Sequence, residues 1–313
     1  MNYKEKIDSL INNIEKVFLG KTKTVKLCVA GILARGHILI EDVPGIGKTT
    51  LAQAIARSMN CKFNRIQFTS DMLPSDILGV SILNPQKAEF EFRKGPIFAN
   101  VILADEINRT PPKTQSALLE AMSEQQVSVD GRTYPLPKPF VVIATQNPIE
   151  YEGTYSLPES QLDRFLLRLD IGYPPSEEEI LIMKRGDILK EINELSPVIT
   201  AEEIVEIQEY VRKIRVEDSV SLYMLQIVEK TRTHPEVELG VSPRGSQSLY
   251  VSAQAWAVVN GRDYVTPNDV KEMAEPVIAH RLILKSRSFN LSKLAEERRK
   301  VVKNILDTVP LPR

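Results

Sequence analysis

A segment rich in glycine, with one lysine, has the spacing of a phosphate-binding loop. It runs from Glu41 to Thr50 and joins a short apolar stretch to a helical pattern. Glycines let the backbone curl until its N–H groups face phosphate oxygens, and the start of the helix adds a positive dipole end. Lys48 can then reach the outer phosphates, while the Thr49 hydroxyl can hold Mg2+. We therefore expect a nucleoside triphosphate to be bound by Pro44, Gly45, Ile46, Gly47, Lys48, Thr49 and Thr50.

The loop departs from the general pattern at one position. Asp42 stands six residues before Lys48, where the full pattern has a glycine. The part that wraps the phosphates is intact. A dinucleotide-binding loop is excluded because its third glycine would fall at Thr50. The alternative is a glycine-rich turn with an exposed lysine.

Two adjacent carboxylates supply the second half of this chemistry. Asp105 and Glu106 follow the apolar run 101–104. At the carboxyl end of a parallel strand such side chains face the crevice where ligands bind. We expect Asp105 to hold the magnesium ion, directly or through water, and Glu106 to deprotonate the attacking water.

The elements that must position these residues alternate along the first half of the chain. Helical patterns lie between most of the apolar strand candidates, which predicts an α/β fold with a parallel five-stranded sheet flanked by helices. After Pro174 and Pro175 the pattern turns helical, and no convincing strand follows residue 190. We expect a nucleotide-binding core over 1–189 and a small all-helical domain over 190–313. The strand candidates are His37–Ile40, Phe63–Phe68, Val101–Ala104, Phe140–Thr145 and Phe165–Ile171.

Composition narrows the class of partner. The chain has 313 residues, with 40 basic against 41 acidic side chains, so bulk charge gives no reason to expect nucleic acid or an anionic membrane. Two cysteines provide no disulfide framework. The longest apolar run is too short to span a bilayer, and the charged first residues do not form a signal peptide. We expect a cytoplasmic protein.

Several ordered motifs, taken together, resemble those of the MoxR family of AAA+ ATPases. The resemblance implies an ATP-hydrolysing protein that assembles into a ring, commonly a hexamer. It further implies a chaperone-like remodeller of protein clients, often working with a partner that carries a von Willebrand factor A domain. The motifs are Glu41–Thr50, Gly95–Asn100, Ala104–Arg109, Gln115–Met122, Ala144–Pro148 and Leu157–Phe165.

The resemblance also assigns roles to four polar residues. Asn147 corresponds to sensor 1, near the γ-phosphate, although an Asx turn with Pro148 would also explain it. Arg164 matches the arginine finger that reaches the neighbouring subunit's nucleotide; Arg109 is a weaker rival, and a helix cap is the alternative. Arg244 resembles sensor 2, the lid-domain arginine that touches the γ-phosphate. An always-charged planar guanidinium suits the charge that spreads during phosphoryl transfer.

Two segments indicate remodelling rather than hydrolysis alone. The stretch 84–98 alternates phenylalanine with charge and predicts a short hairpin or loop before the third strand. The stretch 127–134 alternates around Asp130-Gly131, a signal for a type I′ hairpin. Both resemble elements that project toward the pore of a ring, although two surface hairpins without a task would look the same.

The remaining assignments carry less information. Phe18, Leu19 and Gly20 lie where related proteins line the adenine pocket, although the amphipathic helix before them needs no ligand. The three histidines, His37, His234 and His280, are isolated and predicted to be structural. A solvated helix face explains the basic cluster Arg298, Arg299, Lys300 and Lys303.

Two other classes of function stay open. One is a DNA-remodelling motor, which shares the second hairpin but lacks support from charge or from a basic stretch studded with aromatics. The other is a nucleotide-gated scaffold that barely hydrolyses ATP, which Glu106 and Arg164 argue against.

Overall fold

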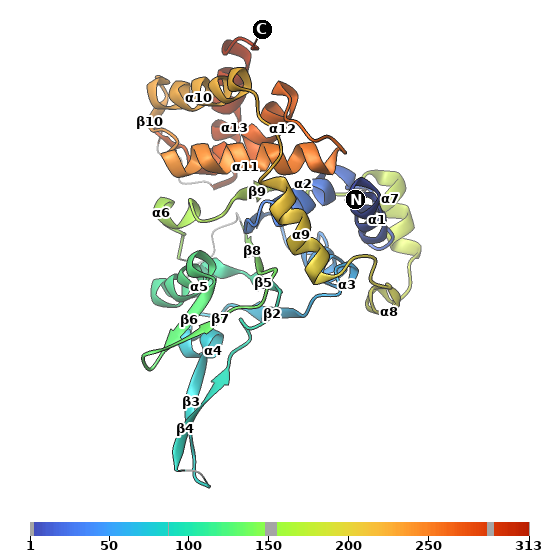
Figure 1. Cartoon of the computed structure of the whole chain (residues 1–313), viewed down its shortest axis with the longest axis vertical. Coiled ribbons are helices and arrows are strands. Elements are labelled where there is room, and N and C mark those ends of the chain that lie inside the picture. The colour runs from blue at the N-terminus through green and yellow to red at the C-terminus, as the bar shows by residue number, and fades with distance from the viewer. Residues whose placement is uncertain (1–2, 87, 148–154, 287–290, 313) are drawn as a thin grey trace.

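A five-stranded parallel sheet forms the centre of the first domain (Figure 1). The structure, a computed structural model, describes residues 3–86, 88–147, 155–286 and 291–312. The strands are ordered β2-β5-β8-β1-β9, so the two segments that carry the predicted chemistry follow strands on either side of β8. All five expected strands are confirmed, as β1 (Ile38–Glu41), β2 (Phe63–Gln67), β5 (Val101–Asp105), β8 (Val141–Gln146) and β9 (Leu167–Leu169).

Helices cover both faces of this sheet because its strands alternate apolar side chains between two cores. Ile38 and Ile40 face one core, which α1 (Tyr3–Glu15), α2 (Thr22–Leu33) and α3 (Lys48–Ser58) complete. Leu39 lies in the other core, beneath α4 (Pro74–Leu78) and α5 (Pro112–Glu124). This two-sided burial is what near-continuous apolar strands predict.

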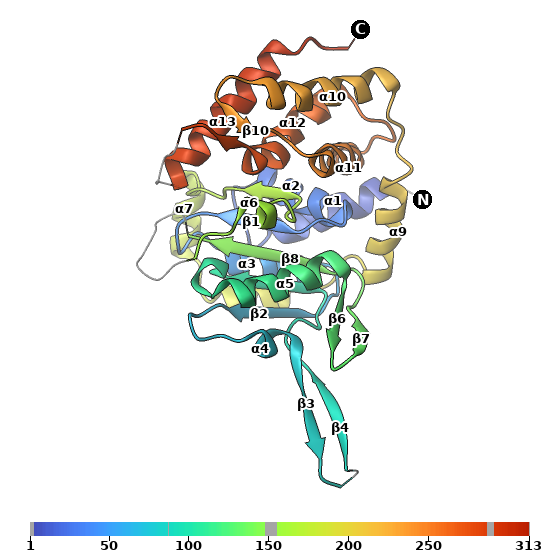
Figure 2. The same cartoon turned by 90° about the vertical axis from the view of Figure 1, so that its left-hand side faces the viewer.

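Two antiparallel hairpins leave the body of the first domain (Figure 2). The longer one is formed by β3 (Gly79–Asn84) and β4 (Glu89–Lys94), and it projects far from the sheet. It begins earlier than the expected segment 84–98, because the preceding helix α4 is only one turn long. The second, β6 (Gln126–Val129) with β7 (Arg132–Pro135), turns at Asp130 and Gly131, whose φ angles of 51° and 73° fit the predicted type I′ turn.

The bases of the two hairpins touch through aromatic rings. Phe92 of β4 stacks on Tyr134 of β7, with centroids 4.2 Å apart and an interplanar angle of 23°. On its other side Phe92 meets the edge of Phe98 at 5.9 Å. Offset stacks of this kind stabilise a contact beyond the area they bury.

The second half of the chain is almost entirely helical. Thr200, Ser242 and Thr266 cap three of these helices with their hydroxyls. One short antiparallel pair, β10 (Val237–Leu239) with β11 (Ile283–Leu284), adds to the helices. The helices are α6 (Glu159–Leu162), α7 (Ser176–Lys184), α8 (Ile188–Glu194), α9 (Ala201–Val211), α10 (Asp218–Thr233), α11 (Pro243–Val259), α12 (Pro267–Ile278) and α13 (Leu291–Thr308), with a 3-10 turn at Ala279–Arg281. A further 3-10 turn, Ile107–Arg109, follows β5 in the first domain.

The two halves share one continuous core. Buried side chains run from the sheet through α2 into α10, α11 and α12. The segment 188–211 packs on the first domain: the Val198 N–H donates to Ser58 O at 3.0 Å, and the Gln208 side-chain amide donates to Ile32 O at 2.8 Å. The predicted boundary near residue 190 therefore falls in chain that contacts the core helices.

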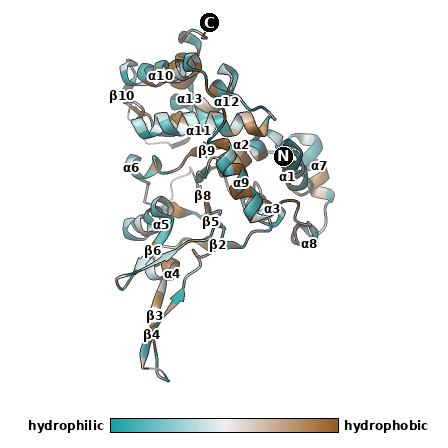
Figure 3. Cartoon of the chain, viewed as in Figure 1, coloured by the Kyte–Doolittle hydropathy of each residue, from teal (hydrophilic) through white to brown (hydrophobic). Residues whose placement is uncertain are grey.

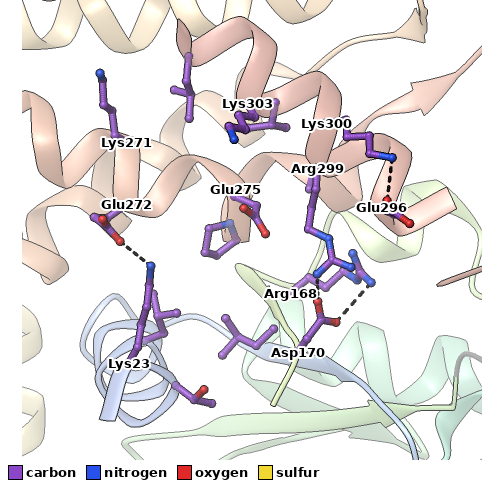
Figure 4. A pocket seen from close by; sticks show the side chains of 17 residues that line it. Lys23, Arg168, Asp170, Lys271, Glu272, Glu275, Glu296, Arg299, Lys300 and Lys303 are labelled. Carbon is purple, nitrogen blue, oxygen red and sulfur yellow. Dashed lines mark hydrogen bonds and ion pairs between the residues drawn. The ribbon is translucent and has the colours of Figure 1, made fainter. Parts of the chain in front are cut away.

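A cleft of about 580 Å³ lies at this junction, between α2, the end of β9, α12 and α13 (Figure 4). Arg299 forms an ion pair with Asp170, and Lys300 pairs with Glu296 at 2.7 Å. The basic cluster of α13 is thus not simply a solvated face, since it supplies part of the contact between the two halves. No helix in the described ranges combines the length and the apolar character needed to cross a bilayer.

Candidate nucleotide-binding and hydrolysis site

The predicted phosphate loop connects the end of β1 to the start of α3. Gly45 and Gly47 have φ angles of 86° and 90°, which L side chains rarely adopt. Gly47 caps α3, so the first N–H groups of the helix open toward the loop. A Cβ at Gly45 would meet no atom within 4 Å, which leaves room in the cradle. Backbone and helix start together form an anion site.

Lys48 is the first residue of α3 and is half-buried. Its Nζ donates to Asp42 O at 2.5 Å across the loop. Burial lowers the pKa of Lys48, while the carboxylates of Asp42, Asp105 and Glu106 oppose this shift. A phosphate would add further negative charge and favour the protonated amine. The Thr49 hydroxyl follows in the same turn.

Asp42, which stands where the general phosphate-loop pattern has a glycine, has a structural role that the sequence did not reveal. One carboxylate oxygen, Oδ2, accepts the N–H groups of Ile171 and Gly172 at 2.8 and 2.6 Å. The other oxygen accepts the N–H of Val43 at 2.8 Å. Asp42 thereby ties the start of the phosphate loop to the chain that leaves β9, a contact no glycine could make.

Asp105 and Glu106 lie where β5 ends, at the carboxyl edge of the sheet that also carries the phosphate loop. The Thr145 hydroxyl donates to Asp105 Oδ1 at 2.5 Å and accepts the N–H of Glu106 at 2.9 Å. Arg65 of β2 donates twice to Asp105 Oδ2, at 3.1 and 2.7 Å. These contacts fix the carboxylate of Asp105 at the end of its strand.

Glu106 occupies a backbone conformation that is rare for a residue with a side chain. Its φ and ψ of 58° and 49° are left-handed. Such strain persists only where surrounding contacts hold it, and it concentrates at functional sites. Gln67 donates its amide N–H to Glu106 Oε2 at 2.8 Å, and Arg109 approaches the same oxygen at 3.1 Å. Arg109 therefore lies beside Glu106 of its own chain.

Asn147 follows β8 directly and is buried at the same edge. Because β8 lies between β5 and β1, Asn147 is placed between the two carboxylates and the phosphate loop. Pro148, whose turn was the alternative explanation, lies outside the described residues.

A cavity of about 440 Å³ adjoins the phosphate loop. Phe18 and Leu19 line it, together with Pro44, Gly45, Ile46 and Gly47, and Phe18 packs against Gly47. Tyr173, Glu179 and Ile182 form the opposite wall. Gly20 lies beside the cavity, where it packs against Glu178 rather than lining the pocket.

Arg164 lies at the opposite edge of the sheet from the phosphate loop. β1 pairs in parallel with β9, with Ile38 opposite Leu167. Arg164 precedes Leu167, so it is level with the residues before β1, whereas the loop follows β1. The four residues of β1 alone, at about 3.3 Å each, separate these levels by roughly 13 Å. The guanidinium is held at that edge, because Nη1 donates to Leu119 O at 3.1 Å and to Ser123 Oγ.

Arg244 lines the same cavity as Arg164, and no residue of the phosphate loop lines that cavity. Arg244 is the second residue of α11 and lines a cavity of about 260 Å³ with Arg35, Arg164 and Arg212. Arg35 pairs with Glu209, and burial followed by the charge of Arg35 lowers the pKa of Arg212. Within the described chain, neither Arg164 nor Arg244 forms an ion pair with a carboxylate. The cavity carries excess positive charge, suited to an anion.

Three polar side chains of the site were not predicted. Arg65 and Gln67 point from β2 toward the two carboxylates, and Thr145 lies between Asp105 and the Glu106 backbone. The sequence holds one signal: three of the five residues of β2, namely Asn64, Arg65 and Gln67, are polar, which is unusual for a strand covered on both sides.

Two of the three histidines, His37 and His280, are buried, in keeping with the structural role predicted for them. The buried ring of His37 donates from Nε2 to Met122 O at 3.0 Å and accepts the Val142 N–H at Nδ1. Burial lowers the pKa of His37 to about 4. His280 lies within hydrogen-bond distance of Phe165 O, and His234 of Asn304.

Known proteins resemble the chain over its whole length. Residues 37–167 match the ATPase family associated with various cellular activities, and residues 229–305 match the AAA lid domain. The uncharacterized protein YeaC of Bacillus subtilis is 49% identical over 100% of this chain and 98% of its own length. Chaperone MoxR1 of Mycobacterium tuberculosis is 40% identical over 98% of this chain and 82% of its own length. A crystal structure from Cytophaga hutchinsonii, 38% identical, superposes with a TM-score of 0.88 over 99% of this chain and 96% of that one.

Proposed function

Because the chain belongs to the MoxR family of AAA+ ATPases, we propose that it hydrolyses ATP with Mg2+ and uses the turnover to remodel a protein partner. The observation that carries this is the shared carboxyl edge of β1, β5 and β8. The phosphate loop, the two carboxylates and Asn147 all lie there. One crevice therefore supplies a loop for the phosphates, carboxylates for the metal and the attacking water, and an amide near the γ-phosphate, which are the groups that ATP hydrolysis needs.

Binding depends on groups that the fold fixes in advance. The loop N–H groups and the start of α3 hold the phosphates, and Lys48 reaches the outer ones. Phe18 and Leu19 hold the adenine base in the adjoining cavity. The Thr49 hydroxyl and the Asp105 carboxylate are hard oxygen donors of the kind Mg2+ prefers. When bound there, the ion neutralises charge on the phosphates.

Hydrolysis depends on Glu106 and Asn147. Glu106 accepts a proton from the attacking water, and its strained backbone and contacts with Gln67 and Arg109 set its direction. Asn147 supplies an amide near the γ-phosphate. A general base is needed only for the chemical step, so loss of the Glu106 carboxylate should leave binding intact.

The arginines complete a neighbour's site rather than their own. Arg164 and Arg244 lie together at the edge of the sheet opposite the phosphate loop. Such an arrangement requires head-to-tail contacts between copies, which close into a ring when the rotation permits. We propose a homo-oligomeric ring of the hexameric kind, with Arg164 as the finger and Arg244 acting beside it.

A protein client is the partner that the two hairpins support. The β3–β4 hairpin presents Leu83 opposite Phe90, and both side chains are exposed. Apolar groups at the end of a projecting hairpin suit an unfolded or partly folded polypeptide. A von Willebrand factor A domain protein is the kind of co-factor protein that we propose presents the client.

A trapping experiment tests the proposal. The Glu106→Gln protein, loaded with Mg-ATP, should retain a client that is captured from lysate and identified by mass spectrometry. The Lys48→Ala protein, which cannot load, is the matched control. ATP turnover by the wild type should rise when the captured client is added. DNA that raised turnover, with a steep decrease in salt, would instead favour the DNA-remodelling motor. ATP binding without turnover at high protein concentration would favour the scaffold.

A further inference from the structure

Helix α7 carries an apolar face that nothing in the described chain covers. Ile180, Leu181 and Met183 are 50%, 53% and 80% exposed, and the helix buries none of its side chains. Figure 3 shows its hydrophilic beginning and the hydrophobic stretch that follows. Scattered exposed apolar residues are ordinary, but a group of them on one short helix marks an interaction surface.

The position of α7 ties this surface to the nucleotide site. Glu179 and Ile182 line the cavity beside the phosphate loop, so α7 is one wall of that cavity. Glu178 packs against Gly20 on the same side. Leu181 and Met183 do not line the cavity. A body that covered them would lie at the rim of the bound nucleotide.

The opposite side of the molecule carries the complementary charge. α6, which Arg164 follows, and α7 lie on opposite sides of the chain in Figure 1. The arginine cavity, lined by Arg164, Arg212 and Arg244, has excess positive charge. α7 begins with Glu177, Glu178 and Glu179, which form no ion pair with the residues that the structure describes. One face thus offers carboxylates beside apolar groups, and the other offers guanidiniums.

We propose that the outer face of α7 docks a second copy of this chain, at the edge that carries Arg164, Arg212 and Arg244. The inference rests on the proposed function, since that places the neighbour's arginines at the nucleotide. It adds the surface that brings them there. The interface is heterologous, because each copy uses α7 on one side and its arginine edge on the other. Burying the apolar side chains of α7 drives the association, while the charges set its orientation.

Polar substitution of the α7 face tests the docking surface. The double variant Leu181→Ser, Met183→Ser removes two outward apolar groups without touching the cavity lining. A matched control is Leu222→Ser, Leu225→Ser on α10, where the side chains are 54% and 42% exposed. Sedimentation velocity with Mg-ATP measures assembly, and a fluorescent ATP analogue measures binding to the dilute chain. We expect association of the α7 variant to weaken at least roughly tenfold, with unchanged nucleotide affinity and turnover reduced in proportion. The control should assemble like the wild type.

A photo-crosslinking amino acid at Met183 then identifies what lies on this face. Crosslinks between copies should map to the carboxyl end of α5, to the end of α9 or to the first turn of α11, around the arginine cavity. Crosslinks to another region of the second copy, or wild-type assembly by the α7 variant, would overturn the inference. Full turnover by a monomeric wild type would also overturn it, yet would leave the ATPase assignment standing. No ATP binding by the wild type would refute the proposed function itself.

Discussion

The carboxylate of Asp42 accepts a hydrogen bond from the backbone N–H of Gly172 at 2.6 Å. The same oxygen accepts the N–H of Ile171, so two successive backbone groups converge on it. The segment that they begin leads through Tyr173 into α7, and Ile171, Gly172, Tyr173 and Pro174 line the cavity beside the phosphate loop. A single side chain therefore connects the phosphate loop to the opposite wall of the cavity.

We predict that Asp42→Gly weakens nucleotide binding, although it restores the general phosphate-loop pattern. Loss of hydrogen bonds to a charged acceptor should cost roughly 1.5–3 kcal/mol and leave the loop without its anchor. Asp42→Asn keeps one acceptor oxygen, so its stability and nucleotide affinity should lie between those of the wild type and Asp42→Gly. Thermal unfolding and calorimetric ATP titration of the three proteins measure both effects. Equal affinity of the glycine variant and the wild type would show that the anchor is dispensable.

We expect Lys48→Ala to abolish ATP binding while leaving the fold intact. The amine faces the loop and contacts Asp42 O, so no core contact is lost. Calorimetry measures binding, and circular dichroism measures the fold. Unchanged affinity would refute the phosphate-loop assignment.

Glu106→Gln should bind Mg-ATP normally and turn it over slowly. Glutamine keeps the shape of the side chain but cannot take a proton, so turnover should decrease by roughly 10²- to 10⁴-fold. Equilibrium binding and phosphate release, measured on the same preparation, separate the two steps. A collapse in affinity with normal residual turnover would mean that Glu106 is structural.

Arg164→Ala and Arg244→Ala should each bind ATP and hydrolyse it poorly, by as much as roughly 10³-fold for the finger. If both act on a neighbour, mixing either variant with Lys48→Ala restores activity. In the mixture, empty pockets and missing arginines lie in different chains. Random assembly at equal amounts makes roughly a quarter of the interfaces complete.

A mixture of Arg164→Ala with Arg244→Ala is the discriminating control. Both residues lie at one edge, so the interfaces in that mixture lack one arginine or the other and turnover should stay low. Recovery of ATP turnover in this mixture alone would mean that Arg164 and Arg244 act at different sites. Full turnover by Arg164→Ala by itself would end the finger assignment and direct attention to Arg109.

Stability should decrease as pH falls from about 6.5 toward 4. The folded pKa of His37 is about 4, below the ordinary 6.5, so the unfolded chain takes up a proton that the folded chain does not. The contribution of neutral His37 to the free energy of unfolding is complete above pH 6.5. It is lost below that pH, by up to roughly 3 kcal/mol at pH 4. Burial lowers the pKa of His280 in the same direction.

Denaturant unfolding at several pH values measures this dependence. His37→Asn, whose amide oxygen can accept the Val142 N–H, should be less stable near neutrality and lose less stability on acidification. His234→Asn, at a partly exposed position, is the control. An equal pH slope for the wild type and His37→Asn would exclude His37 as the source.

The sequence predicts the sheet well because burial on both faces leaves long apolar runs. The motifs Glu41–Thr50 and Val101–Glu106 are local, so spacing alone places their residues on one edge. Long-range contacts carry no such signal: the Asp42 anchor joins segments far apart in the chain, and Gln67 meets Glu106 only because β2 pairs with β5. The position of Arg244 beside Arg164 depends on how α11 packs, which no local pattern encodes.

Phe92 contacts both Tyr134 and Phe98, so the base of the long β3–β4 hairpin is held while the rest of the hairpin projects from the sheet. Phe98 precedes β5, which ends in Asp105, and Tyr134 precedes β8, which contains Thr145. The base of the hairpin thus contacts one residue that precedes β5 and one that precedes β8. The arm of the hairpin is roughly 20 Å long, so a 5° tilt at the base moves the tip by roughly 2 Å. A change of tilt at the base would therefore displace Phe90, which lies toward the tip, more than the residues of the base.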